Sequence, residues 1–310
     1  WRWLEPPARG IIFEKVPFFL LALAAAVVAL IAKQEFQALY SLATYGWSVR
    51  LVESFYGLAF YLWKTVLPFG LSPLYQLPAQ TEIFTWPFLL SAISVVILTA
   101  ALVILRTKWP AGAACWGWYG VLLIPVLGLV QFGPQIVADR YSYLSCLSWA
   151  LLAAGAFYRY SNLGKPSQGR TMAAGAIAAI VLMTLAYLTW NQIGVWRNTE
   201  TLWTHVLNVA PNSSIAHYNL GKRHDIEGRV AEAMKLYRRA LTLNPAYAEA
   251  HYNLARLLAK QGLRDEAIDH YRQALAFKPN DADTHNNLGL LLAQRGDAPA
   301  ALGAFQRAVE

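Results

Sequence analysis

Charged side chains are scarce in this sequence, and cysteine is nearly absent. Of the 310 residues, 14% are charged and 56% are hydrophobic, which is typical of a membrane protein rather than of a soluble one. The two cysteines, Cys115 and Cys146, match no metal or disulfide spacing, so the sequence predicts neither a zinc site nor a disulfide framework. They are interpreted as packing residues.

The surplus of positive charge, formally +8, belongs to the apolar part of the chain. Residues 1–197 hold 13 basic and 6 acidic side chains, whereas residues 198–310 hold 13 and 12. Basic residues at the ends of hydrophobic runs indicate membrane topology, while a nucleic-acid site needs a basic face on a soluble element. Nucleic acid is therefore excluded as a partner.

Five apolar stretches approach or exceed the roughly 20 residues that cross a bilayer as a helix. They are residues 16–32, 83–105, 116–135, 141–158 and 171–195. Together they predict a polytopic transmembrane domain over residues 1–195. Residues 48–66 also have a helix-length apolar core, which is interpreted as an amphipathic helix lying on or dipping into the outer leaflet. A sixth span is the alternative.

Lysine and arginine set the predicted orientation, because these residues are retained on the cytoplasmic side. Segments 1–15, 106–115 and 159–170 carry eight of them in 37 residues, whereas segments 33–84 and 133–142 carry four in 62. Five spans that begin inside place the C-terminal region outside. The sequence thus predicts an integral protein of a bacterial inner membrane whose C-terminal region lies in the periplasm.

A period of 34 residues governs residues 196–310. The segments "HYNLGK", "HYNLAR" and "HNNLGL" begin at residues 217, 251 and 285, and alanine, aromatic and proline positions recur with them. Small residues at fixed helical positions let paired antiparallel helices pack closely, and proline ends the second helix of a pair. The sequence therefore predicts an α-solenoid of tetratricopeptide repeats and an all-α fold for the whole chain.

Two ladders of polar side chains recur in the repeats. One is His217, His251 and His285. Its members are interpreted as packing residues, because adjacent packed helices lie roughly 10 Å apart, too far for one metal ion to be shared. The other is Asn219, Asn253 and Asn287, on the side that lines the inner groove. These carboxamides suit binding of an extended peptide. The alternative is that asparagine is simply common at this position in such repeats.

The order of the parts resembles a known family. The most specific pieces are "KTVLPFGLSPLY" and "ADRYSYL", followed by a last apolar run and "WRNTETLWTHVLNVAPNSSIAHYNLGK". The chain is similar to the C-terminal part of the transmembrane and tetratricopeptide-repeat O-mannosyltransferases of eukaryotes and their bacterial relatives, in the GT-C glycosyltransferase class. The resemblance implies sugar transfer from a polyprenyl-phosphate donor on the outer or lumenal face, with repeats that bind a protein acceptor or partner.

The resemblance also suggests roles for five residues. A lipid phosphate at the interface needs a cation, which Arg140 would supply as a bidentate donor and Lys64 as a point charge. Asp139 would orient Arg140 or the acceptor, and Tyr141 and Tyr143 would line the same pocket. Alternatively, Asp139 and Arg140 form a solvated pair at a span end, with the tyrosines in the interfacial aromatic belt.

In GT-C enzymes an acidic general base lies in the first external loop. That loop is expected upstream of Trp1, so this chain would lack its base and any donor-metal region and would be inactive alone. The sequence itself indicates no metal site and leaves any cofactor unknown. A second interpretation is a non-catalytic, membrane-anchored scaffold whose repeats bind other proteins.

Overall fold

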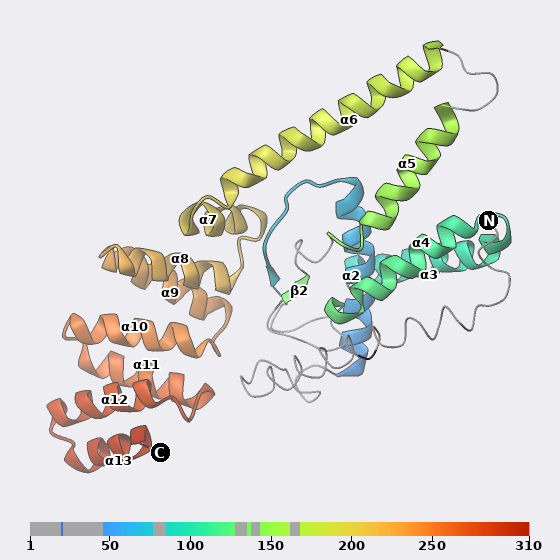
Figure 1. Cartoon of the computed structure of the whole chain (residues 1–310). Coiled ribbons are helices and arrows are strands. Elements are labelled where there is room, and N and C mark those ends of the chain that lie inside the picture. The colour runs from blue at the N-terminus through green and yellow to red at the C-terminus, as the bar shows by residue number, and fades with distance from the viewer. Residues whose placement is uncertain are drawn as a thin grey trace. The chain divides into compact units, whose positions relative to one another are not determined.

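The computed structural model describes residues 20, 46–76, 85–127, 135–137, 143–161 and 168–309 (Figure 1). In these ranges the elements are helices apart from two short strands, β1 (Tyr75–Gln76) and β2 (Gln135–Val137). The prediction of a helical chain is confirmed. The chain divides into two compact units, which are described separately: residues 1–60 with 81–136, and residues 61–80 with 137–310.

The helices of the first unit expose much of their apolar surface. They are most of α2 (Trp47–Val66), α3 (Trp86–Ile104) with the 3-10 turn η1 (Leu105–Thr107), and α4 (Pro110–Leu123) with the 3-10 turn η2 (Ile124–Val126). On α3 the buried residues Phe88, Val95 and Leu102 recur every seven residues, so one narrow stripe faces protein. Leu90 and Ile97, on its other sides, are exposed. Lipid is the solvent that suits such a surface.

Helix α2 buries polar side chains and exposes apolar ones, which is the reverse of an amphipathic helix in a soluble protein. Its buried stripe contains Arg50, Glu53 and Ser54, whose exposed fractions are 6%, 2% and 8%. The hydroxyl of Ser54 donates to the carbonyl of Leu127 at 2.8 Å, whereas Trp47 on the outward face is 60% exposed. Ionisable side chains that face protein while apolar ones face outward are typical of membrane-embedded helices. The position of α2 in the outer leaflet, with a sixth span as the alternative, stays a prediction.

Two helical runs in the described residues are long and apolar enough to cross a membrane. They are Trp86–Thr107, with a mean hydropathy of 2.8, and α6 (Gln168–Val195), with a mean hydropathy of 2.0. Helix α6 has no charged side chain after Arg170, and its one buried residue is Ala174. A helix that is apolar all round and exposed all round does not form the core of a soluble domain.

The remaining predicted spans stay predictions. Residues 16–32 lie outside the described residues except for Leu20. The predicted spans 116–135 and 141–158 contain only shorter helices, namely the end of Pro110–Val126 and most of α5 (Leu147–Ser161), and both also include residues outside the described ranges.

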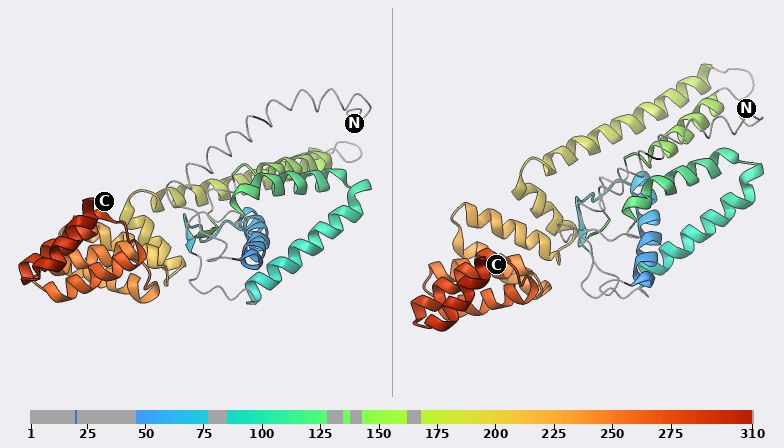
Figure 2. Two further views of the ribbon diagram at one scale, coloured as in Figure 1. Left: turned by 90° about the horizontal axis from the view of Figure 1, so that it is seen from below. Right: turned by 60° about the horizontal axis from the view of Figure 1, so that its bottom comes forward.

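The helices after α6 stack as antiparallel pairs (Figures 1 and 2). They are α7 (Thr199–Val209), α8 (Ser214–Ile226), α9 (Val230–Leu243), α10 (Ala248–Lys260), α11 (Arg264–Phe277), α12 (Ala282–Arg295) and α13 (Ala298–Val309). In both views of Figure 2 the orange-to-red helices lie against one another in chain order.

Small residues set the spacing within each pair of repeat helices. Ala233 and Ala267 have no exposed surface, and the aromatic residues Tyr237 and Tyr271 are buried beside them. The turn between the two helices of each pair has a glycine at positive φ, which only glycine adopts without strain. These glycines are Gly228, Gly262 and Gly296, with φ of 77°, 81° and 90°. Both features recur with the 34-residue period.

Replacing Ala267 by leucine should destabilise the repeats by about 1–3 kcal/mol, because the added atoms enter a filled core. Ala276 is exposed on the same helix, so Ala276→Leu is the matched control and should change stability by less than about 0.5 kcal/mol. Urea unfolding of the full chain in detergent, followed by hydrogen exchange of α10 and α11, measures both. Equal effects of the two substitutions would contradict the packing argument.

Candidate functional site

The predicted donor-phosphate cluster falls only partly within the described residues. Asp139, Arg140 and Tyr141 lie outside them, so their roles stay predictions. Lys64 and Tyr143 are described, and both belong to the second unit. Their surroundings define two separate features, a braced loop around Lys64 and a cavity beside Tyr143.

Lys64 closes the loop that follows α2. Its ammonium group donates to the carbonyls of Phe69 and Gly70, the latter at 3.3 Å, and lies 5.8 Å from the ring centre of Tyr75. The hydroxyl of Tyr75 donates to the same Gly70 carbonyl at 2.9 Å. Gly70 has a φ of 58°, in the left-handed region that glycine favours. Lys64 therefore holds the "KTVLPFGLSPLY" loop in one conformation.

This loop is tied to the junction between α6 and the repeats through a single carbonyl. The oxygen of Leu71 lies 3.3 Å from Nε2 of Gln192, on α6, and 2.9 Å from Nε2 of His205, on α7. A carbonyl only accepts, so Nε2 is the protonated nitrogen of His205. Two donors from consecutive helices thus share one acceptor in a loop more than 100 residues earlier in the chain.

The turn from α6 to α7 is itself held by side chains. Asn198 is the N-cap of α7 and accepts from the backbone N–H of Thr201 at 2.8 Å. The hydroxyl of Thr201 lies 3.0 Å from the carbonyl of Val195, at the end of α6. These bonds fix the direction in which the first repeat helix leaves the apolar helix.

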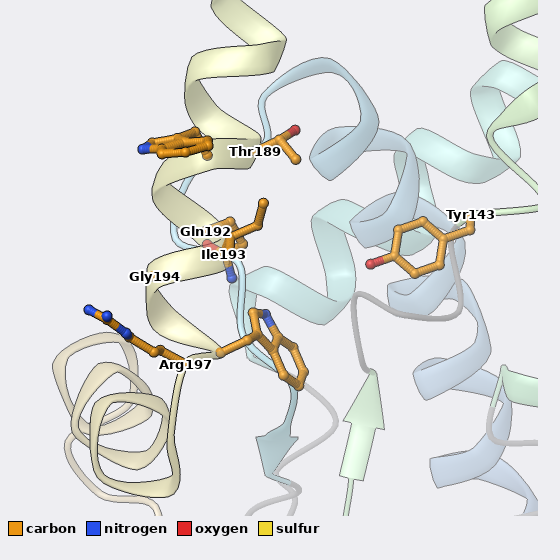
Figure 3. A pocket seen from close by; sticks show the side chains of 8 residues that line it. Tyr143, Thr189, Gln192, Ile193, Gly194 and Arg197 are labelled. Carbon is orange, nitrogen blue, oxygen red and sulfur yellow. The ribbon is translucent and has the colours of Figure 1, made fainter.

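Tyr143 borders a cavity of about 680 Å³ at the C-terminal end of α6 (Figure 3). The other lining residues are Thr189, Trp190, Gln192, Ile193, Gly194, Trp196 and Arg197. In Figure 3 the hydroxyl of Tyr143 faces α6, whereas the side chain of Arg197 lies on the far side of that helix. Aromatic rings, an apolar helix end and a guanidinium suit an amphiphilic ligand with an anionic head.

Arg197 was not predicted as a site residue. The signal for it in the sequence is a cation placed directly after the last apolar run, in "WRNTETLW". A basic residue there also fits ordinary anchoring of a span at the membrane interface. The sequence alone does not distinguish this anchoring role from that of a cation in a binding site.

The asparagine ladder connects successive repeats. Nδ2 of Asn253 donates to the hydroxyl of Tyr218 at 3.1 Å, and Nδ2 of Asn287 donates to that of Tyr252 at 3.2 Å. Nδ2 of Asn219 instead donates to the carbonyl of Ile215 at 2.8 Å. Each carboxamide thus uses one of its two N–H groups for a hydrogen bond within the repeats. Peptide binding by the three asparagines stays a prediction.

A cavity of about 240 Å³ opens beside this ladder. Its lining combines tyrosine hydroxyls, an asparagine and charges of both signs: Tyr218, Lys222, Ala248, Glu249, Tyr252, Asn253, Ala274, Lys278, Asp281, Asp283 and Thr284. Lys278 and Glu249 form an ion pair at its rim. Burial, with a smaller contribution from the charge of Glu249, raises the pKa of Tyr218, so its hydroxyl remains a neutral donor and acceptor. Such a lining matches the alternating donors and acceptors of a polypeptide backbone.

The histidine ladder has a structural role. In each repeat Nε2 of the histidine meets the carbonyl of the proline six residues earlier, at 3.0 Å for His217, 3.0 Å for His251 and 2.7 Å for His285. The contact fastens the start of each first helix to the turn before it. Burial lowers the pKa of His217 and of His251 below the usual value.

Comparison with known proteins identifies the repeats. The tetratricopeptide repeat family matches residues 202–248, 226–286 and 270–303. Residues 202–303 are therefore tetratricopeptide repeats, as the 34-residue period predicts. The chain is also similar to a solved structure of MamA, with 26% sequence identity and a TM-score of 0.34. The similar region is 39% of this chain and 71% of the MamA chain.

The chain is also similar to curated proteins named as protein O-mannosyl-transferases. Protein O-mannosyl-transferase TMTC4 of Mus musculus is 31% identical over 125 residues, which is 38% of this chain and 16% of that protein. Protein O-mannosyl-transferase F38B6.6 of Caenorhabditis elegans is 26% identical over 201 residues, which is 62% of this chain and 27% of that protein. The chain thus spans less than a third of either relative.

The repeats should lose stability as the pH falls below about 6.5. His217, His251 and His270 have pKa values lowered chiefly by burial, so the unfolded chain binds more protons than the folded chain in this range. The stabilisation is complete above the unfolded pKa and is lost as the pH falls through the folded values. Hydrogen exchange of α8–α11 between about pH 7.5 and 5.5, corrected for intrinsic rates, measures it. Protection that does not change with pH would contradict the assignment.

Removing either donor to the Leu71 carbonyl should loosen the loop. Gln192→Ala and His205→Ala should each cost about 0.5–1.5 kcal/mol and speed amide exchange in residues 67–76. Because the two donors share one acceptor, the effects of the double variant should not be additive. Asn208→Ala, at an exposed position of α7, is the control. Strict additivity, or an equal effect of the control, would refute the shared bond.

Proposed function

We propose that this chain is part of a membrane glycosyltransferase that takes a sugar from a polyprenyl-phosphate donor, while its repeats bind the protein acceptor or a protein partner. One observation carries the proposal: a membrane-length apolar helix passes through a braced turn into tetratricopeptide repeats, in a chain similar to proteins named as protein O-mannosyl-transferases. The reaction belongs on the outer face of a bacterial inner membrane, with the repeats in the periplasm.

The donor end of the site lies at the membrane interface near the end of α6. Arg140 is the proposed bidentate donor to the lipid phosphate, Asp139 orients it, and Tyr141 lines the same pocket. The cavity at the C-terminal end of α6 supports this arrangement, because Tyr143, Arg197 and two indoles are among its lining residues. An anionic head can then meet a cation while the polyprenyl chain remains against apolar surface.

Lys64 has a modified role in this proposal. Its ammonium group donates to two carbonyls of its own loop, so its first role is structural. Lys64 acts first by fixing the loop between α2 and β1, and only secondarily as a point charge toward the donor.

The acceptor end is the inner groove of the repeats. The carbonyl oxygens of Asn219, Asn253 and Asn287 accept from backbone N–H groups of an extended polypeptide, and the mixed lining of the neighbouring cavity tolerates different sequences. The braced turn between α6 and α7 keeps this groove in a fixed relation to the end of the membrane helix. A polypeptide held there stays close to the interface where the donor lies.

The alternative is a non-catalytic scaffold, anchored by its spans, whose repeats bind other proteins. The engagement of Lys64 by its own loop favours it, since this lysine has a structural purpose without any ligand. Deleting the repeats would then abolish function, whereas changing Arg140 would not.

In the full-length protein, Arg140→Ala should reduce sugar transfer from a polyprenyl-phosphate donor at least roughly 10- to 100-fold, because its charge-assisted, bidentate contact with the phosphate is lost. Arg106→Ala changes an exposed arginine of η1 outside the proposed site and is the control. Transfer to a peptide acceptor by purified protein in nanodiscs measures both. Unchanged turnover with normal expression would refute the donor role and favour the scaffold.

A further inference from the structure

Two histidines of the second repeat face each other through their Nδ1 atoms. Nδ1 of His251, on α10, lies 2.9 Å from Nδ1 of His270, on α11. The ring centres are 5.2 Å apart and the ring planes are inclined by 38°. The pair therefore connects the two helices of one repeat, away from the residues that line the inner cavity.

The hydrogen bonding of His251 directs its Nδ1 lone pair toward His270. Its Nε2 lies 3.0 Å from the carbonyl oxygen of Pro245, so Nε2 carries the proton of the neutral ring. His251 is 8% exposed, and this burial favours the neutral form. Histidines that bind metals have the same arrangement, with the second ring nitrogen donating to a backbone carbonyl or carboxylate.

The pair departs from the repeat pattern. The positions 34 residues before and after His270 hold Leu236 and Ala304. In the first repeat, His217 makes the same contact with its proline, and its buried Nδ1 has no hydrogen-bond partner among the described residues. His217 and His251 thus both have a buried Nδ1 that their contact with proline does not use. In the second repeat, His270 places another ring nitrogen beside it.

We propose that His251 and His270 bind a divalent transition-metal ion that prefers imidazole, such as Zn²⁺, between α10 and α11. Two nitrogens about 2.0–2.1 Å from one ion lie roughly 2.9–3.4 Å apart for bond angles between a right angle and the tetrahedral value. The observed separation is 2.9 Å. On binding, the Nδ1 proton of His270 moves to its Nε2, so that both Nδ1 lone pairs face the ion and no charge is lost from either ring.

Water completes the coordination shell. Within the described ranges no group of three or more His, Cys, Asp or Glu side chains is placed to hold a metal ion. His270 is half-buried, so solvent and the ion reach the pair from its side. The charges of Glu266 and Asp269 favour a cation there, while Arg238 opposes it. The guanidinium of Arg238 lies 3.3 Å from Glu266 and is partly neutralised by it.

A bound ion would join the two helices of the central repeat. Helix α10 also carries Tyr252 and Asn253, which take part in the hydrogen bonds between successive repeats. The ion therefore stabilises the middle of the groove without occupying it. This inference does not depend on the glycosyltransferase activity.

The test compares zinc-dependent hydrogen exchange in the full chain, in detergent and after treatment with EDTA. ZnCl₂ should slow exchange in α10 and α11 of the wild type, and MgCl₂ should not, because Mg²⁺ prefers oxygen ligands. His270→Leu installs the residue that the first repeat has, so it should fold and lose the zinc effect. His285→Ala removes a histidine–proline contact of the third repeat but leaves the pair, so it should keep the zinc effect.

A gain-of-site variant provides the second arm. Leu236→His places an imidazole opposite the Nδ1 of His217, so ZnCl₂ should now also slow exchange in α8 and α9. Zinc protection of α10 and α11 that is absent in the wild type, or that persists undiminished in His270→Leu, would overturn the proposal. In that event the two rings form only a neutral hydrogen bond.

Discussion

The carbonyl oxygen of Leu71 is the point at which the second unit is joined together. It accepts from Gln192 at the end of the apolar helix and from His205 at the start of the repeats. Lys64 holds the loop that presents this carbonyl. These bonds add a second connection between α6 and the solenoid, beside the turn at Asn198. They therefore help to fix the direction of the repeats relative to α6.

The same rule of burial works in opposite directions in the two halves of the chain. In the repeats, alanines and tyrosines are buried and charges are exposed, because the surrounding solvent is water. In α2, Arg50 and Glu53 are buried while Trp47 is exposed, which is the pattern expected of a helix whose outward face meets hydrocarbon. The boundary between these two patterns lies between Val195, where the long apolar helix ends, and Thr199, where the capped repeat helix begins.

The features that the sequence predicts well are those that depend on local or periodic information. The 34-residue period determines the helix pairs, their alanines and the turn glycines, so the solenoid follows from the sequence directly. The length and apolarity of α6 are equally local. By contrast, the role of Lys64 depends on carbonyls in a loop bent by Gly70, and the role of Leu71 on partners 121 and 134 residues away. No pattern within one segment contains such contacts. His270 is likewise not predicted by the 34-residue period, because the equivalent positions of the neighbouring repeats hold Leu236 and Ala304.

The helices α7 to α13 form a linear stack that begins at the turn after α6. Each repeat packs mainly against its immediate neighbours, so a small rotation at one interface is added to those before it. The amplitude of motion should therefore grow from α7 toward α13. Relative to α6, the helices early in the stack would keep a nearly fixed orientation, whereas later helices would sample a wider range of positions.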